Sequence, residues 1–329
     1  MANLVYKRLF KLALAALLAG CASEPVPHHV EYPKNTQQQS KIPPTRYPSN
    51  QHIQQYPNSY GRSPYSGSYG SSGLTGTYAN SFAVKSFIQH MVNKHGFSEA
   101  YLNRLFSQAN RLDSVIRLES PAPSTGPSKP RLGSWTRYRN KFLTDAHISN
   151  GVEFWRNNAD AIKQASVTYG VDPEYIVGII GVETYFGKNF GKTCIFDALT
   201  TLSFDTYRRS DYFKSELENF LLMTRDEGFD PRQPQGSWAG AMGYGQFMPS
   251  SFRKLAVDFN HDGRRDLWHP KDAVGSVEGD EFWRIYPNFK VIKKYNNSNK
   301  YAMAVHQLAQ AIKQRYQQEY AGNVGYLTN

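Results

Sequence analysis

The stretch that decides the fold is Asp172-Pro173-Glu174-Tyr175-Ile176-Val177-Gly178-Ile179-Ile180-Gly181-Val182-Glu183. It predicts a helix, because Asp is a favoured N-cap and Pro suits the first helical position. Three isoleucines and Glu183 recur three and four residues apart, so they share one face of this helix. Glu183 therefore ends an apolar stripe, where burial raises the pKa of a carboxyl group. A raised pKa is what a general acid needs at neutral pH.

The glycines that follow predict open space beside Glu183. Gly187 and Gly191 are expected to end the helix and to leave room next to the carboxylate. The spacing also allows a plainer alternative, in which Glu183 is a helix-end residue that pairs with Lys188 or Lys192.

A second informative segment, residues 236–250, combines small residues, aromatic residues and one amide. Small residues let the backbone approach a ligand closely. Aromatic rings offer flat faces to sugar rings, and the amide of Gln246 offers both a donor and an acceptor. The alternative is a glycine-rich turn within the core.

Three motifs together resemble the membrane-bound lytic murein transglycosylase B family: residues 181–187, 203–209 and 240–250. The resemblance spans about residues 87–277 and resumes over about 288–312. It implies a mainly α fold, with a lysozyme-like catalytic core, helical and small mixed subdomains, and an EF-hand-like loop. It also implies cleavage of the peptidoglycan bond between N-acetylmuramic acid (MurNAc) and N-acetylglucosamine (GlcNAc), with formation of 1,6-anhydro-MurNAc ends.

The resemblance assigns site residues as well. It makes Glu183 the catalytic acid, and Arg208 a residue that helps to hold the catalytic surroundings. The remaining substrate-binding positions that it implies are Ser237, Gln246, Tyr295, Asn296 and Tyr301. Without the resemblance, Tyr295 and Asn296 would be only the polar start of a helix.

Residues 258–266 match the opening of an EF-hand calcium loop. Side-chain oxygens stand at positions 1, 3, 5 and 9, and a glycine stands at position 6. Position 12 is His269 instead of the usual Glu, so a turn without metal is the alternative. The family has a longer loop, which implies the ligands Asp258, Asn260, Asp262, the Arg264 carbonyl and Asp272, with Asp266 facing the metal or capping the turn. A structural Ca²⁺ is therefore expected, and no organic cofactor.

The chain departs from the family after Val277, where Glu278-Gly279-Asp280-Glu281 cannot continue an apolar helix face. The catalytic domain is expected to be shortened between about 278 and 287. This favours, as an alternative function, a weakly active or non-catalytic peptidoglycan-binding lipoprotein. A hydrolytic muramidase is the other alternative, but it ordinarily needs a second carboxylate. The candidates Asp226 and Glu227 are predicted to lie on a polar helix surface.

The amino terminus indicates export. Basic residues precede the short apolar run 12–19, and Leu18-Ala19-Gly20-Cys21 resembles a bacterial lipobox. We expect a signal peptide over 1–20, a tether rich in Pro, Gln, Ser and Gly over 21–80, and the catalytic domain over 81–329. Lipid on Cys21 would anchor the protein to the outer membrane of a Gram-negative bacterium, facing the periplasm. The alternative is an ordinary signal peptide in which the cysteine occurs by chance.

The amino-acid composition limits the classes of binding partner that are expected for this protein. The 329 residues carry a net charge of +11, which suits an anionic polymer such as peptidoglycan with its carboxylates. Nucleic acid is disfavoured, because the chain is expected to be exported. Two cysteines exclude a disulfide scaffold and a multi-cysteine zinc site. Other cell-wall enzymes are further candidate partners.

Overall fold

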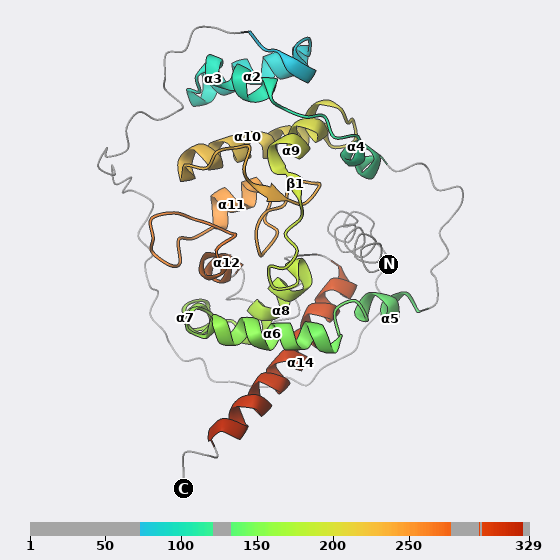
Figure 1. The fold of residues 1–329 in the computed structure, drawn as a ribbon, viewed down its shortest axis with the longest axis vertical. Helices are drawn as coiled ribbons and strands as arrows, with labels where there is room; N and C mark the ends of the chain where they lie inside the picture. The colour runs from blue at the N-terminus through green and yellow to red at the C-terminus, as the bar shows by residue number, and fades with distance from the viewer. Residues whose placement is uncertain (1–72, 121–132, 278–295, 297, 325–329) are drawn as a thin grey trace, which may run out of the picture.

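The computed structural model describes residues 73–120, 133–277, 296 and 298–324, with side chains to residue 319. These residues are mostly helical, as the sequence predicts (Figure 1). The predicted signal peptide, Cys21, Tyr295 and the segment 278–287 lie outside the described residues. No helix in the described ranges has both the length and the hydropathy needed to cross a membrane.

The central element is helix α8, Pro173–Thr184, with Asp172 at its N-cap position. Nearly every side of this helix is buried, so the prediction of one apolar face was too narrow. Helix α14, Asn299–Val324, packs against it at a site where α8 carries glycine. A Cβ on Gly178 would lie 3.0 Å from the Ala309 Cβ and from the Val305 carbonyl oxygen. The glycine therefore permits the close approach that brings the start of α14 to the end of α8.

Three more helices surround α8 in the lower half of the view (Figure 1). They are α5 (Ser134–Arg139), α6 (Asp145–Asn157) and α7 (Ala159–Tyr169). Helices α6 and α7 pack on α8, and α5 and α6 pack on α14. These helices enclose the end of α8 with aromatic side chains.

The upper half of the view is a second helical layer (Figure 1). It consists of η1 (Gly76–Tyr78), α2 (Phe82–His95), α3 (Glu99–Ser107), α4 (Asp113–Glu119), α9 (Ile195–Phe204) and α10 (Ser210–Glu227). Tyr78 is buried there, and its hydroxyl donates to Asp205 Oδ2 at 2.7 Å. The folded unit therefore begins a few residues before the boundary expected at 80.

A small mixed region joins the two layers. Strands β1 (Thr193–Cys194) and β2 (Gln235–Gly236) pair antiparallel, and short bridges continue through Met242 and Phe247. Helices α11 (Pro249–Leu255) and α12 (Pro270–Val277) follow on either side of the predicted calcium loop. The glycine-rich segment thus forms compact β structure directly beside α8.

Candidate active site

Glu183 lies in the last turn of α8, at a point where the backbone reverses sharply. Tyr185 and Phe186 both adopt left-handed conformations, with φ of 55° and 57°. The helix therefore ends on two non-glycine residues, whereas Gly187 and Gly191 were expected to end it. Such strained conformations are concentrated at functional sites, because the surrounding structure must hold them in place.

The environment of Glu183 favours its protonated form. The residue keeps some accessible surface, but its Oε1 is buried, and no hydrogen bond to this oxygen is found among the described residues. Burial raises the pKa of Glu183 to about 7, and a hydrogen bond from the Tyr301 hydroxyl opposes this rise. A carboxyl group that is largely protonated near neutral pH can donate a proton.

Among the acidic side chains of the described residues, Glu183 differs in having a buried carboxyl oxygen, Oε1, that accepts no hydrogen bond. Four of them bind a cation or a hydroxyl group: Glu119 binds Arg209, Glu174 binds Lys313, Asp197 binds Arg232 and Glu216 binds Ser250. Within the described ranges, no charged side chain contributes to the pKa shift of Glu183, only burial and Tyr301. Lys188, the suggested surface partner, instead donates to Asn150 Oδ1 and lies 5.6 Å from the Tyr185 ring centroid. Within the described residues, Glu183 therefore lacks a cation partner and keeps one buried oxygen without a hydrogen bond.

The glycine-rich segment brings Gln246 close to the end of α8. Thr184 Oγ1 donates to the Tyr244 carbonyl at 3.1 Å and joins the two elements. The Gln246 amide donates to the carbonyls of Gly243 (3.0 Å) and Phe190 (3.3 Å). Its Oε1 is buried and has no hydrogen-bond partner among the described residues. An acceptor held in this way can bind a ligand N–H or O–H.

Ser237 is fully buried and organises the turn of the same segment. Its Oγ accepts from the backbone N–H groups of Ala239 (3.3 Å) and Ala241 (2.9 Å). Gly191 lies against this turn, and a Cβ there would be 2.0 Å from the Gly236 carbonyl oxygen. The contacts of Ser237 are those of the glycine-rich core turn that we considered as an alternative.

The region before α14 supplies two further predicted residues. Tyr301 is buried beside Glu183. Asn296 Oδ1 accepts from the Ser298 backbone at 3.2 Å, whereas its Nδ2 is buried without a partner among the described residues. The structure thus offers an unsatisfied amide donor here and an unsatisfied amide acceptor at Gln246.

Arg208 is placed differently from the other predicted residues. Its Nε lies 3.4 Å from Glu119 Oε1, and the side chain is mostly exposed. Glu119 is fully buried and also binds Arg209. The described contact of Arg208 is therefore with α4, not with Glu183.

Two aromatic residues near Glu183 were not predicted as site residues. Burial and the charge of Glu183 raise the pKa of Tyr138 above its usual range. Burial lowers the pKa of His147 to about 4, opposed by a hydrogen bond to the Gly181 carbonyl, so this imidazole is neutral at pH 7. Its ring centroid is 4.2 Å from that of Tyr185. The sequence feature that could have indicated Tyr138 as a site residue is the presence of aromatic residues in the basic segment 133–139.

The predicted calcium loop brings three carboxylates together. Oxygens of Asp258, Asp262 and Asp272 lie within 4.8 Å of one another. Asp272 is buried and accepts three backbone N–H groups of the loop, while burial raises the pKa of its carboxyl. Asn260 Oδ1 accepts from the Asp262 backbone at 2.9 Å. Oxygen ligands gathered in this way fit Ca²⁺, and Asp266 caps the Trp268 backbone N–H at 2.8 Å.

The burial of the Glu227 side chain contradicts one prediction about the surface of α10. Its side chain is almost fully buried and accepts from Arg265 Nε at 2.8 Å and from the Arg265 backbone at 3.0 Å. The prediction of a polar surface was therefore wrong for Glu227, because it holds the calcium loop against α10. A carboxylate held in this ion pair is not available as the general base or nucleophile, which is the role of the second carboxylate in a hydrolase.

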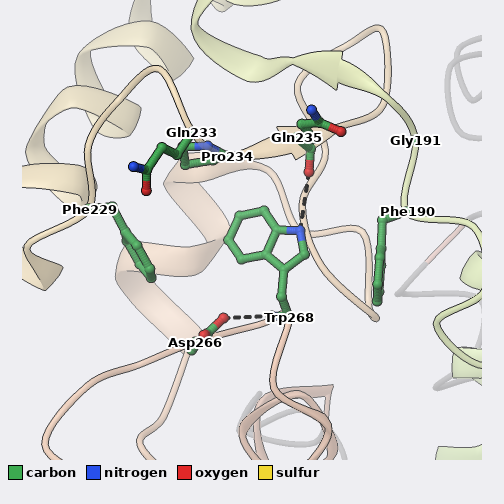
Figure 2. Close-up of a pocket in the computed structure, with 8 residues that line it drawn as sticks. All are labelled: Phe190, Gly191, Phe229, Gln233, Pro234, Gln235, Asp266 and Trp268. Atoms are coloured by element: carbon green, nitrogen blue, oxygen red, sulfur yellow. Dashed lines mark hydrogen bonds between the residues drawn. The ribbon is translucent and has the colours of Figure 1, made fainter.

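A cavity of about 390 Å³ adjoins the glycine-rich segment (Figure 2). Phe190, Phe229 and Trp268 form aromatic walls, and Gln235 and Asp266 add polar groups. The Trp268 indole donates to the Gln235 carbonyl at 3.1 Å. Phe190 also accepts from the Gln246 amide, so this cavity is next to the predicted substrate-binding residues.

The structure places a carboxyl group with a raised pKa at the end of a buried central helix, next to aromatic and amide groups. This arrangement is typical of the lysozyme-like, glycan-cleaving enzymes, in which a carboxylic acid protonates the leaving oxygen. Comparison with known proteins gives the family. The family model described as the transglycosylase SLT domain matches residues 79–279 and 277–310 of this sequence. The chain therefore belongs to this family.

Individual relatives agree with the family. The membrane-bound lytic murein transglycosylase B of Escherichia coli is 45% identical over 296 aligned positions, which cover 69% of this chain and 82% of the relative. Solved structures of the Escherichia coli lytic transglycosylase SLT35, one with calcium and one with bulgecin A, are each 42% identical. Both have a TM-score of 0.67 and cover 74% of this chain and 96% of the solved chain.

The alignments also bear on the segment after Val277. The alignment with the Escherichia coli relative has 296 positions, which is more than the 69% of this 329-residue chain that it covers. The surplus positions are gaps in this chain, so part of the relative has no counterpart here. The family model matches in two separate segments, which overlap in this chain at residues 277–279, the place where the sequence was expected to depart from the family.

Proposed function

We propose that this chain is a peptidoglycan lytic transglycosylase in which Glu183 acts first as acid and then as base. Glu183 donates its proton to the glycosidic oxygen between MurNAc and GlcNAc, and the bond from that oxygen to C1 breaks. The MurNAc ring passes through an oxocarbenium-like state, with assistance from its own N-acetyl group. The C6 hydroxyl then bonds to C1, and its proton returns to Glu183. The observation that carries this proposal is the buried carboxyl of Glu183, whose Oε1 accepts no hydrogen bond among the described residues and whose pKa burial raises to about 7.

The unsatisfied amide groups support a role in orienting the substrate. Gln246 Oε1 can accept from an acetamide N–H or a sugar hydroxyl, and Asn296 Nδ2 can donate to an acetamide carbonyl. Binding a sugar would satisfy both buried groups, and leaving them unsatisfied has a cost. Ser237, Tyr295 and Tyr301 complete the proposed substrate-binding set. Arg208 acts at most through its contact with Glu119.

We also propose that Asp258, Asn260, Asp262, the Arg264 carbonyl and Asp272 bind a structural Ca²⁺. The converging carboxylates support this, as does the calcium complex of a related structure. The ion would neutralise their mutual repulsion and fix the loop that carries Asp266 and Trp268.

The proposed location is the outer membrane, with the catalytic domain facing the periplasm and lipid on Cys21 as the anchor. The name of the Escherichia coli relative, a membrane-bound enzyme, supports this location. The proposed partner is the glycan strand of peptidoglycan, and other cell-wall enzymes are further candidates.

The test is the release of soluble fragments from purified peptidoglycan by the wild type and by Glu183→Gln. We expect the variant to lose fragment release but still to sediment with insoluble peptidoglycan. Asp226→Asn also removes one carboxylate, from the accessible end of α10, and should keep its activity. Undiminished release by Glu183→Gln would contradict the proposal.

A further inference from the structure

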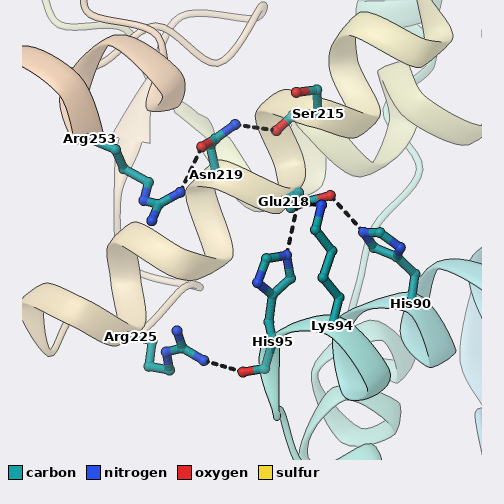
Figure 3. Close-up of polar contacts among 8 residues, drawn as sticks. All are labelled: His90, Lys94, His95, Ser215, Glu218, Asn219, Arg225 and Arg253. Carbon is teal, nitrogen blue, oxygen red and sulfur yellow. Dashed lines mark hydrogen bonds and ion pairs between the residues drawn. The ribbon is translucent and has the colours of Figure 1, made fainter.

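A cluster of metal-ligand side chains joins α2 to α10 at a place that the proposed function does not use (Figure 3). His90 Nε2 lies 2.9 Å from Glu218 Oε2, and His95 Nε2 lies 2.8 Å from Glu218 Oε1. Each oxygen of one carboxylate therefore faces a different imidazole. The residues are more than 120 positions apart in the sequence, so only the fold brings them together.

We propose that His90, His95 and Glu218 form a binding site for a divalent transition-metal ion, Zn²⁺ above all. One ligand atom from each of these residues lies within 4.8 Å of the others. Two imidazoles and one carboxylate, with a water molecule in the fourth position, form a known tetrahedral zinc ligand set. Imidazole nitrogen favours Zn²⁺, whereas Ca²⁺ requires oxygen ligands and is expected at the Asp258–Asp272 loop.

The site can accept the ion through small movements. Zinc ligands at about 2.0–2.1 Å from the metal lie about 3.3 Å from one another in a tetrahedron. The three ligand atoms lie within 4.8 Å of one another, so each pair must change its separation by at most about 1.5 Å to reach this spacing. The His90 side chain is 42% exposed and leaves a route from solvent. A shift of each ring proton from Nε2 to Nδ1 frees the lone pair that binds the metal.

Lys94 controls this site, because its Nζ lies 3.0 Å from Glu218 Oε1. The ammonium group competes with a metal ion for the carboxylate, and its positive charge repels the metal ion. The Lys94 side chain is 57% exposed and flexible, so it can turn into solvent when a metal ion binds. Removing its charge should therefore strengthen metal binding, whereas removing a histidine should weaken it.

The elements that carry the ligands are held in place by other contacts. Arg225 donates to the His95 carbonyl at 2.7 Å and lies 4.6 Å from the Phe97 ring centroid (Figure 3). Asn219, next to Glu218, donates to the Ser215 carbonyl and accepts from Arg253 at 3.0 Å. A bound ion would join two positioned helices and stabilise the packing of the upper layer.

The experiment measures Zn²⁺ binding to the purified full chain in excess CaCl₂, by calorimetry and by Co²⁺ absorption spectroscopy. We expect His90→Ala to bind Zn²⁺ about tenfold or more weakly than the wild type. The matched variant Lys94→Gln, one helical turn away, should bind it about tenfold more tightly. Comparison with His90→Ala also corrects for Zn²⁺ bound by His28 and His29, which lie outside the described residues.

The outcomes separate this site from the proposed enzyme activity. We expect a tetrahedral Co²⁺ spectrum in the wild type that is lost in His90→Ala. Zn²⁺ should raise the melting temperature of the wild type and of Lys94→Gln, but not that of His90→Ala. Peptidoglycan cleavage should be the same in His90→Ala and in the wild type. Equal Zn²⁺ affinity in the wild type, His90→Ala and Lys94→Gln would overturn the proposal.

Discussion

Replacing Glu183 with Gln should stabilise the folded chain, and the gain should depend on pH. Burial raises the pKa of this carboxyl from 4.5 to about 7. Between these values the folded chain holds a proton that the unfolded chain has released. The contribution of Glu183 to the free energy of unfolding is therefore fully present below pH 4.5 and is lost as the pH rises to 7.

The magnitude follows from the distance between the two pKa values. At 1.36 kcal/mol per pH unit, the loss amounts to about 3 kcal/mol. Glutamine is neutral at every pH, so Glu183→Gln avoids this loss. The difference in unfolding free energy between the variant and the wild type should therefore grow by about 3 kcal/mol from pH 4 to pH 8.

Urea denaturation at pH 4, 6 and 8 measures this difference directly. The value at pH 4 serves as an internal control for changes in shape and hydrogen bonding, because the carboxyl is protonated there in both states. Asp226→Asn controls for the loss of one carboxylate and should show no such growth. A difference between Glu183→Gln and the wild type that stays constant from pH 4 to pH 8 would refute the reasoning.

Three further predictions follow from single contacts. Tyr301→Phe removes a hydrogen bond that lowers the pKa of Glu183, so the alkaline limb of the activity profile should move up by about one pH unit. Gly191→Ala places a Cβ 2.0 Å from a carbonyl oxygen and should cost about 3 kcal/mol in denaturant unfolding; Gly228→Ala, which meets nothing within 4 Å, should cost only about 1 kcal/mol. With free Ca²⁺ at 100 times its Kd, the melting temperature should be about 5–10 °C higher than in the presence of a chelator. This rise should be absent in Asp258→Asn, and an equal rise in the variant would count against the calcium loop.

Local sequence signals predicted the main features of the fold. The Asp-Pro pair and the run of isoleucines placed α8 correctly, because capping and apolar content act within a few residues. Its burial on nearly all sides was not predicted, since that depends on α14, which is more than 100 residues later in the chain. The exact end of α8 was missed because Tyr185 and Phe186 adopt φ values that their residue types rarely favour.

The candidate site was predicted only in part for a similar reason. Glu183 carries a local signal, but its proximity to Tyr138 and His147 arises from tertiary packing of α5 and α6. The burial of Glu227 depends on Arg265, which is 38 residues away. Asn296 and Gln246 could be named as polar residues, but their unsatisfied atoms are visible only in the folded structure.

Mass spectrometry of the fragments released from purified peptidoglycan tests the central claim most directly. If Glu183 takes the proton of the C6 hydroxyl of MurNAc while this oxygen bonds to C1, the fragments end in 1,6-anhydro-MurNAc. Their mass is then lower by one water than the mass of hydrolytic products. Glu183→Gln should release none of them. Fragments that end in reducing MurNAc would contradict the mechanism, because water would then have attacked C1.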